Sequence, residues 1–473
     1  MLTVGRRTTI ATLDDVSDGA PMVLMHGFPA DRKLWSARGS RLASMVLRTV
    51  AVIFLTTPAS AQQTARTVPH APLPHTYSAA ATAQSTAPSE KVAQLCYPLL
   101  SDDTIVAGPE QRKRAGEMAL PPLTDEANGF AWPDTELGVI KTTQGYAFFA
   151  SDGGYHGRQN WEGVSEGNNK YGSVTRTLGT LDNPLGSESP IDVSIRPNPD
   201  PAANPFYSSY DYLGGGPVYR VPAGKTGAGN LLMVYHAEIP TVTTMSFYSV
   251  LGLASSTDEG FTWIDLGEIV RINQGYRPDM DGYDIGDSNL VASPDGRYFY
   301  LYFADWLANG TTHWLASINF VALARAPIDA VLAAAFAAKN PHASAFEKRY
   351  DGWNVDQGMG GYSRDLRPDA PFWGPLRVSW NSDLNRYQAF INNGSLIAYA
   401  ESPDGLLWSM PTVLKNFSGD PHHPGFYVTP VGLGNDPDIL GKKFDVLYTY
   451  YPNNGQGWAG ASVRRFTVSC QQP

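Results

Sequence analysis

The chain has 473 residues, a formal net charge of −10 and only 17% charged residues, whereas glycine (46), proline (36), tyrosine (24) and tryptophan (11) are plentiful. The negative charge argues against nucleic acid as a partner, because phosphates require a basic face. Abundant turn formers and aromatic residues are typical of a protein built from short strands. The composition suits a neutral or weakly charged sugar polymer without selecting one.

The first 93 residues are predicted to precede the fold. Residues 45–61 match an export signal, because a positive residue and a short apolar run are followed by Ala59-Ser60-Ala61, a small-residue cleavage site. We expect cleavage after Ala61, a secreted or periplasmic protein and no membrane contact afterwards, since a bilayer span needs about 20 apolar residues. Residues 62–93, rich in Ala, Thr, Pro and Ser, predict a flexible linker.

Residues 1–44 do not belong to this export signal. They contain Pro21–Trp35, PMVLMHGFPADRKLW, which resembles the strand and His-Gly loop of α/β-hydrolases. Nothing later in the chain supplies the rest of that fold. We therefore interpret residues 1–44 as a misplaced start or a fused leader, and we place the folded domain at residues 94–473.

A predicted β-hairpin carries the first candidate site. Two runs rich in β-branched and aromatic residues, Leu137–Thr142 and Tyr146–Ala150, are separated by a short turn. Asp134 before the first strand and Asp152 after the second are equidistant from residue 143, so an antiparallel pair is expected to bring them together. Facing residues have Cβ atoms about 4.5–5.5 Å apart, and the carboxylates of a retaining glycosidase lie about 5–5.5 Å apart. The alternative is that both aspartates only end strands.

This hairpin resembles the opening of five-bladed propeller glycosidases of the endo-D-arabinanase type. Members carry Thr-Asp-Leu-Gly before the first strand and Phe-Gly-Asp-Thr after the second. This chain has Asp134-Thr135-Glu136-Leu137-Gly138 and Ala150-Ser151-Asp152-Gly153 at these places. Glu136 therefore competes with Asp134 for the role of the first carboxylate.

Strand-rich segments continue along the chain and predict an all-β fold. Residues 162–210 are expected to be loops, and further strand units begin near Gly214, Asp284, Phe372 and Gly425. Each unit contains about four short alternating runs, which is typical of a β-propeller blade, and five blades fit the length better than six or seven. The third unit also contains a predicted short helix, Ile328–Ala338.

Two turns favour the propeller architecture. Ser256–Trp263, STDEGFTW, has the complete Asp-box pattern Ser-x-Asp-x-Gly-x-Thr-Trp, and Ser402–Trp408 is a reduced copy. In this motif the Ser and Asp bond turn amides, the Gly takes a positive φ and the Trp packs under the hairpin. Asp-boxes are structural, so Asp258 is not expected to be catalytic.

The two cysteines of the chain, Cys96 and Cys470, stand at opposite ends of the folded region. A propeller brings its two ends together, and an exported protein meets an oxidising compartment, so we expect a disulfide between them. The alternative is two free thiols.

A second candidate site is expected where the first strand of each blade meets the propeller axis. Asp287 and the turn after it resemble a run of glycoside hydrolase family 43 in which the aspartate tunes the acid and orients the substrate. Asp284 competes for this role, and turn capping is the alternative for both. That family's blade-four Glu-Gly-Pro is Trp373-Gly374-Pro375 here, which shifts the prediction towards Asp134 and Asp152 as the catalytic pair.

In the fifth unit, His422 and His423 are candidates for holding an axial ion such as a structural Ca²⁺, with a surface histidine pair as the alternative. Aromatic side chains are candidates for stacking on sugar rings, although most of them are expected in the core. No zinc, phosphate-loop or dinucleotide pattern is present, so no cofactor is required. The substrate-binding candidates are Trp132, Tyr155, His156, Trp161, Tyr212, Trp306 and Trp373.

Together these features predict a monomeric, exported five-bladed β-propeller glycoside hydrolase. It would degrade an arabinan-type polysaccharide by a retaining reaction of two aspartates. Two alternatives stay open. The run Tyr219-Arg220-Val221-Pro222 ahead of an Asp-box resembles the start of a sialidase, in which Arg220 would bind the substrate carboxylate. The other alternative is a propeller that binds sugar without cleaving it.

Overall fold

The computed structural model describes the folded region in segments. These are residues 92–108, 111, 133, 135–151, 173–186, 191–210, 212–241, 247–273, 275–277, 284–305, 321–344, 346–350, 352–354, 358–361, 363, 366, 376–392, 395–417, 425–450 and 461–471. The predicted leader, export signal and nearly all of the linker lie outside them and stay predictions. Within the described segments, no helix is long and apolar enough to cross a membrane.

The first four-stranded meander consists of β3 (Gly138–Thr142), β4 (Gly145–Ser151), β5 (Ser173–Gly179) and β6 (Ile191–Arg196), paired in chain order. The prediction that residues 162–210 are loops is therefore wrong for β5 and β6. Both strands alternate apolar and polar residues, and Val174, Val193 and Ile195 are buried. Gly, Asn and Pro surround these short runs, which is why composition indicated loops.

The first hairpin is tighter than predicted. Thr142 pairs with Gly145, so the hairpin is centred between residues 143 and 144. Gly145 takes a φ of 141°, and a Cβ there would lie 2.5 Å from the carbonyl oxygen of Gly179. A shift of one residue moves side chains to the other face of a strand. Equal distance from residue 143 therefore no longer indicates that Asp134 faces Asp152, and both residues lie outside the described segments.

The second meander consists of β7 (Tyr212–Arg220), β8 (Leu231–Pro240), β9 (Phe247–Ser256) and β10 (Trp263–Arg271). A parallel contact between β6 and β10, with Trp263 opposite Ile195, joins the first two meanders into one eight-stranded sheet. Every residue of β9 is buried, as expected for a strand covered on both faces.

The third sheet contains β11 (Ile285–Ala292), β12 (Tyr298–Asp305), β13 (Val321–Pro327), β14 (Glu347–Arg349) and β15 (Trp353–Asn354). The predicted helix is present after β13 as α3 (Ile328–Ala335), and it buries Ile328, Val331, Leu332 and Ala335 at helical spacing. The fourth sheet contains β16 (Leu376–Asn381), β17 (Arg386–Asn392), β18 (Leu396–Ser402) and β19 (Thr412–Asn416), with β21 (Ile439–Leu440) parallel to β16.

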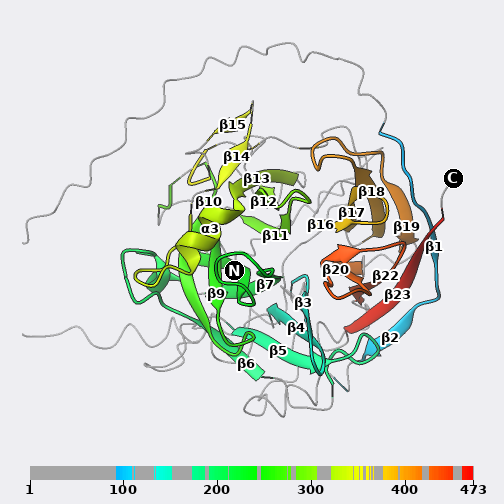
Figure 1. Ribbon diagram of the computed structural model, residues 1–473, viewed down its shortest axis with the longest axis horizontal. Helices are drawn as coiled ribbons and strands as arrows, with labels where there is room; N and C mark the ends of the chain where they lie inside the picture. The colour runs from blue at the N-terminus through cyan, green and yellow to red at the C-terminus, as the bar shows by residue number, and fades with distance from the viewer. Residues whose placement is uncertain are drawn as a thin grey trace, which may run out of the picture. The chain divides into compact units, whose positions relative to one another are not determined.

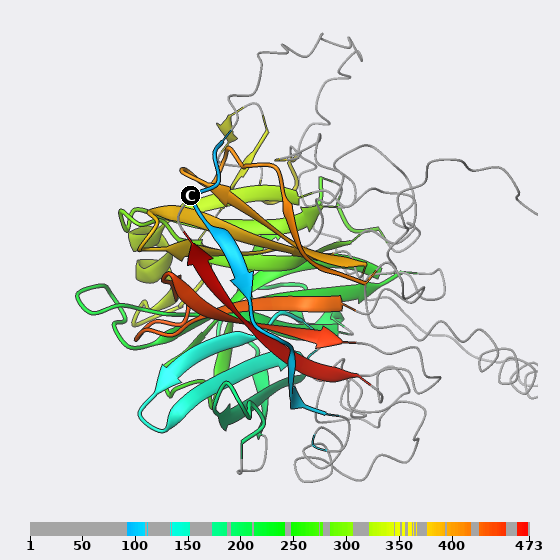
Figure 2. The same cartoon turned by 90° about the vertical axis from the view of Figure 1, so that its right-hand side faces the viewer.

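The fifth sheet combines both ends of the folded region. It contains β20 (Gly425–Gly432), β22 (Lys443–Tyr450) and β23 (Ser462–Gln471), with β1 (Tyr97–Leu100) and β2 (Thr104–Ala107) both paired to β23. Figure 2 shows β1 in blue beside β23 in red. The predicted disulfide is present: Cys96 is bonded to Cys470, with their Cα atoms 4.7 Å apart. β1 and β2 were not predicted as strands, because their short runs lie next to the linker.

The first strands of the five meanders lie around a common centre (Figure 1). β3 contacts β7, β7 contacts β11, β11 contacts β16 and β16 contacts β20. The ring closes where the backbone N–H of Leu137, just before β3, donates to Thr429 Oγ1 of β20 at 2.9 Å. Below, these five strands are called the inner strands.

The two turns singled out in the sequence are held by their own side chains. Ser256 Oγ accepts the Gly260 N–H at 2.9 Å, and Asp258 accepts the Thr262 N–H at 2.9 Å. Trp263 is fully buried and donates its Nε1–H to the Gly260 carbonyl at 3.1 Å. The second turn repeats this arrangement, since the Gly405 N–H donates to Ser402 Oγ and the Trp408 Nε1–H to the Gly405 carbonyl.

Candidate functional site

Buried polar side chains gather where the inner strands β7 and β11 begin. Tyr212 is the first residue of β7, His236 and Glu238 lie near the end of β8, and Asp284 immediately precedes β11. Their exposed fractions are 7%, 8%, 8% and 1%. Antiparallel pairing places the start of β7 beside the end of β8, so the sheet itself brings these residues to one edge.

His236 and Asp284 form the centre of this cluster. Asp284 Oδ1 lies 3.4 Å from His236 Nε2 and accepts the Ser249 hydroxyl at 2.8 Å. Ser249, near the start of β9, is fixed in turn by the Ile285 N–H, which donates to its Oγ at 2.6 Å. A carboxylate held in place in this way fixes the position of the polar group that faces the imidazole. Sequence reasoning missed His236, although a histidine inside the apolar run LLMVYHAEIP was a usable signal.

Tyr212 connects this cluster to the first hairpin. Its ring lies 5.8 Å from the His236 ring, and its hydroxyl shares a short hydrogen bond with Ser151 Oγ. The Ser151 N–H donates to Thr135 Oγ1 at 3.3 Å, and Thr135 Oγ1 donates to the Gly215 carbonyl at 3.0 Å. Thr135 and Ser151 are the chain neighbours of Asp134 and Asp152. Tyr212 was predicted to bind substrate, and it lies in the described site as a largely buried side chain.

Asp287 occupies a bulge near the start of β11. The pairing with β12 shifts between Gly286 and Asn289, and Asp287 takes a φ of 46°. The inner strand β20 has the same kind of shift between Phe426 and Thr429, where Tyr427 takes a φ of 51°. Bulges re-aim side chains, and non-glycine residues held in this region are concentrated at functional sites. Asp287 was predicted from sequence, whereas nothing in the sequence indicated Tyr427.

A buried arginine and two carboxylates lie among the inner strands. Arg377 of β16 and Glu136, just before β3, are each 2% exposed. Arg377 Nη2 donates to Asp438 Oδ1 at 3.1 Å. Burial lowers the pKa of Arg377, while Asp438 and Glu136 oppose this shift. Glu136, which competed with Asp134 as a catalytic carboxylate, therefore also serves as a counter-charge for Arg377.

A buried lysine, Lys348 of β14, lies beside Asp305, the last residue of β12. Lys348 Nζ donates to the carbonyl of Gly361 at 2.8 Å and to that of Arg271 at 2.5 Å, and it lies 3.8 Å from Asp305 Oδ2. Burial lowers the pKa of Lys348 to about 8, with Asp305 opposing the shift. Ser363 Oγ donates to the same Asp305 oxygen at 2.6 Å. Through the Arg271 carbonyl, this cluster joins the end of β10 in the second meander to β12 and β14 of the third sheet.

The remaining predicted site residues cannot be compared with the structure. They lie outside the described segments and stay predictions: Asp134, Asp152, Trp132, Tyr155, His156, Trp161, Trp306, Trp373, His422 and His423. Among the side chains that the structure describes, no group of three His, Cys, Asp or Glu residues could hold a metal ion.

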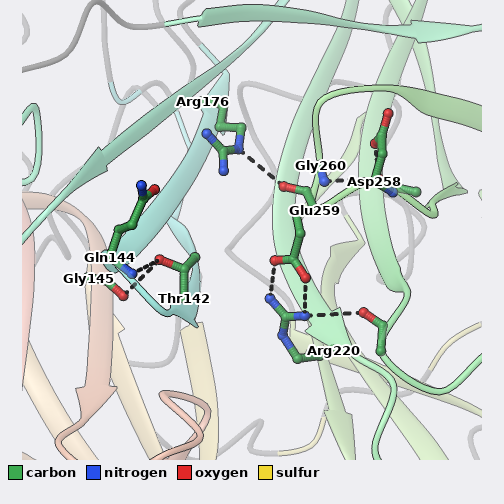
Figure 3. A network of polar contacts seen from close by, with 10 residues as sticks. Thr142, Gln144, Gly145, Arg176, Arg220, Asp258, Glu259 and Gly260 are labelled. Carbon is green, nitrogen blue, oxygen red and sulfur yellow. Dashed lines mark hydrogen bonds and ion pairs between the residues drawn. The ribbon is translucent and has the colours of Figure 1, made fainter.

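Arg220 lies at the other end of β7 from Tyr212, as its last residue. Its guanidinium donates to both carboxylate oxygens of Glu259, at 2.8 and 2.5 Å, as Figure 3 shows. Glu259 belongs to the Ser256–Trp263 turn, and its carbonyl accepts Arg176 Nε at 3.2 Å. The hydrogen bond from Arg220 lowers the pKa of Glu259. The Arg220 guanidinium therefore holds this turn through Glu259, whereas the sialidase alternative requires it to bind the carboxylate of a substrate.

No family model matches this chain, and no curated protein matches it. Several solved structures are similar to it. The catalytic domain of a family 62 α-L-arabinofuranosidase from Coprinopsis cinerea is 10% identical, covering 80% of this chain and 99% of that one, with a TM-score of 0.42. A family 117 glycoside hydrolase from Zobellia galactanivorans is 12% identical, covering 79% and 91%, with a TM-score of 0.44.

An α-L-arabinofuranosidase from Fusarium graminearum, solved with an iminosugar inhibitor, is 10% identical, covering 72% of this chain and 92% of that one, with a TM-score of 0.38. These three proteins are named as glycoside hydrolases. Their likeness to this chain is too distant to assign it an activity.

Proposed function

We propose that this chain is an exported glycoside hydrolase with a five-bladed β-propeller fold, cleaving furanosidic linkages of an arabinan-type polysaccharide. The observation that carries the proposal is the convergence of buried polar side chains where the inner strands begin. Tyr212, His236 and Asp284 come from three different strands or strand edges and lie beside the first hairpin. Convergence of polar side chains at one end of a ring of strands is typical of a site that binds a polar substrate.

In the proposed reaction, Asp134 and Asp152 act as the two carboxylates of a retaining glycosidase. One attacks the anomeric carbon, and the other first protonates the leaving oxygen and then activates water. Two neighbouring carboxylates push one pKa upward, as the proton donor requires. In support, their chain neighbours Thr135 and Ser151 are hydrogen-bonded to each other at 3.3 Å. The roles of the two aspartates are not assigned.

His236 and Asp287 have supporting roles in this proposal. An imidazole oriented by Asp284 can donate a hydrogen bond to a sugar hydroxyl or ring substituent. Asp287, held in its bulge with a φ of 46°, offers a carboxylate that tunes the acid and orients the substrate. Neither role needs a cofactor. An axial ion at His422 or His423 belongs to the same proposal as an optional structural element.

The test is a reducing-sugar assay of the exported protein against arabinans, xylan, galactan, fructan and sialosides. We expect turnover on an arabinan, and a loss of about 10²-fold or more in Asp134→Asn and Asp152→Asn, because general acid–base help is worth about 10²–10⁴-fold. Asp182→Asn is the matched control, because this carboxylate lies on a turn, is 77% exposed and pairs with Arg465 of β23. More than about a tenth of wild-type activity in either aspartate variant would remove the pair from the mechanism.

Other outcomes distinguish the alternatives. Saturable binding of arabinan without product, unchanged by Asp152→Asn, would establish a sugar-binding propeller in place of an enzyme. Release of sialic acid, abolished by Arg220→Ala, would establish a sialidase. Amino-terminal sequencing of the exported protein tests the localisation, since cleavage after Ala61 gives a chain beginning at Gln62.

A further inference from the structure

A cavity of about 210 Å³ lies where the inner strands end, away from the candidate site. The last two residues of β7, Tyr219 and Arg220, form one wall, and the turn after β11 forms another. Asp436 and Asp438, between β20 and β22, form the third. A water molecule occupies about 30 Å³ of liquid, so the cavity has room for a small organic molecule as well as for solvent.

Most of the wall is apolar, and the polar groups are concentrated on one side. Leu290, Val291, Val378 and Ile328 supply aliphatic surface, and the Tyr219 ring supplies an aromatic one. The carboxylates of Asp436 and Asp438 stand at one end of this surface. Two acidic residues on a turn would not by themselves make a site. An apolar cavity that ends in two carboxylates is what a molecule with an apolar body and a polar head fits.

The charges around the cavity are not balanced. Arg220 is matched by Glu259 at 2.5 Å, and Lys225 is matched by Asp329 at 2.7 Å. Arg377 is the cation that faces Asp438, at 3.1 Å. Asp436 receives only the backbone N–H of Asp438 among the hydrogen bonds of the described residues, at 3.0 Å. Among the described residues, the carboxylates of Asp436, Asp438, Glu259 and Asp329 therefore outnumber the cations Arg220, Lys225 and Arg377 by one, and Arg220 is shared between Glu259 and Asp436.

We propose that this cavity binds a small organic cation, a primary alkylammonium whose charged head lies between Asp436 and Asp438 and whose carbon chain lies against the apolar wall. The Tyr219 ring adds an aromatic face that can make a cation–π interaction with the ammonium group. A free amine and the side chain of a peptide lysine share this chemistry. The site is independent of the proposed hydrolase activity, because it uses none of the residues at the start of the inner strands.

Protonation of Asp438 should control this binding. Burial raises the pKa of Asp438 to about 7, the Arg377 guanidinium opposes the shift, and Asp436 adds to it. Asp436 is exposed at its outer side, but the desolvation of its carboxylate by the cavity wall raises its pKa as well, with the Asp438 N–H and Arg220 opposing. Tyr219 stays neutral in this range, since burial and both aspartates raise its pKa. With a pKa near 7, the ionised fraction of Asp438 increases about tenfold from pH 6 to pH 8.

The experiment is calorimetric titration of the whole exported chain with n-butylammonium chloride at constant ionic strength. We expect saturable binding at pH 8 and about tenfold weaker binding at pH 6. Asp438→Asn should weaken binding at pH 8 about tenfold and remove the pH dependence. Asp436→Asn, at an exposed residue, should also weaken binding at pH 8 with little risk to folding, and it should keep the pH dependence because Asp438 still titrates. Asp182→Asn, which makes the same charge change far from the cavity, should bind like the wild type.

Two further titrants separate the sources of the cation. Tighter binding of N-acetyl-lysine amide than of n-butylammonium supports a peptide lysine as the ligand, and the reverse supports a free amine. Equal binding of n-butanol would overturn the proposal, because the charge would then contribute nothing. Absence of saturable binding by the wild type at pH 8, or wild-type affinity in Asp436→Asn and Asp438→Asn, would overturn it as well.

Discussion

The two ends of the inner strands hold polar residues in different ways. Where β7 and β11 begin, His236, Asp284 and Ser249 are buried; Ser249 donates to Asp284, which lies 3.4 Å from His236 Nε2. Where β7 ends, Arg220 and Glu259 are partly exposed, with side-chain exposures of 33% and 48%, and they hold a turn in place. Burying a polar group costs free energy unless a hydrogen bond or an opposite charge compensates it. The buried polar groups at the start of β7 and β11 therefore indicate a functional site there.

Because of this difference, two aspartates in similar positions are assigned different roles. Asp258 and Asp284 are both aspartates at strand ends, and both accept hydroxyl hydrogen bonds. Asp258 bonds residues of its own turn, which closes a local structure. Asp284 bonds Ser249 and faces His236 from other parts of the chain, so it connects two meanders.

The largest effect is expected for Arg377→Met. The side chain is 2% exposed, donates to the partly exposed Asp438 and interacts electrostatically with the buried Glu136, so its removal leaves both carboxylates without their cation. Breaking a buried pair in this way costs about 3–5 kcal/mol of unfolding free energy. Urea unfolding measures it, with Arg297→Met as control, since that arginine is 73% exposed. A loss below about 1 kcal/mol would mean that Arg377 does not support the centre of the fold.

The next largest effect is a pH dependence of stability that is set by Lys348 of β14. The pKa of Lys348 is lowered from 10.5 to about 8 in the folded chain. Between these values the unfolded chain binds more protons, so stability is expected to rise with pH from about 8 to 10.5, by about 3 kcal/mol. Below pH 8 both states hold the proton and the slope disappears. Urea unfolding at pH 7.5, 8.5 and 9.5 measures the slope.

Variants of Lys348 separate this dependence from other titrations. Lys348→Met should remove the slope, whereas Lys339→Met, on an exposed position after α3, should keep it. A slope that persists unchanged in Lys348→Met would assign the pH dependence to other groups. Measurements stay below pH 10, because ionisation of the tyrosines lies above it.

The sequence predicted long, regular features well and local geometry poorly. The helix at Ile328, most strands of the second, fourth and fifth meanders and the Cys96–Cys470 bond followed from alternation, turn residues and the expected closure of the ring. β5 and β6 were missed because their runs are short and flanked by turn formers. The register of the first hairpin differed by one residue because a two-residue turn and a three-residue turn look alike around Gly145.

The candidate site was harder to predict, because its residues meet only in three dimensions. Asp287 was found through a local motif, and its bulge was not foreseeable from that motif. His236 and Arg377 each interrupt an apolar strand, LLMVYHAEIP and LRVSWN. A charged or titratable residue inside such a run has to be paired when it is buried, and that is a usable signal. The partner itself, such as Asp284 for His236, depends on the packing of distant strands.

A paired experiment then compares Asp284→Asn with Asp258→Asn. Asp284→Asn should lower activity roughly 10–100-fold, because the carboxylate that faces His236 and accepts the Ser249 hydroxyl is replaced by an amide. A hydrogen bond to a charged group is worth about 1.5–3 kcal/mol. Asp258→Asn should cost about 1 kcal/mol of stability and leave kcat and KM unchanged, because its hydrogen bonds stay within the turn. Kinetics and urea unfolding of both variants measure the contrast. Equal losses of activity in the two variants would contradict the assignment of a functional role to Asp284 and a structural role to Asp258.

The smallest effect is expected for Arg220→Ala. Its pair with Glu259 has good geometry, with donor distances of 2.8 and 2.5 Å, but both side chains are well solvated. Exposed pairs of this kind contribute about 0–1 kcal/mol, and salt screens them. The variant should therefore unfold within about 1 kcal/mol of the wild type, and the difference should shrink in 1 M NaCl. Hydrolysis of arabinan should be unchanged, because Arg220 lies at the opposite end of β7 from Tyr212. A large loss of activity with intact folding would instead move the functional site to the end where Arg220 lies.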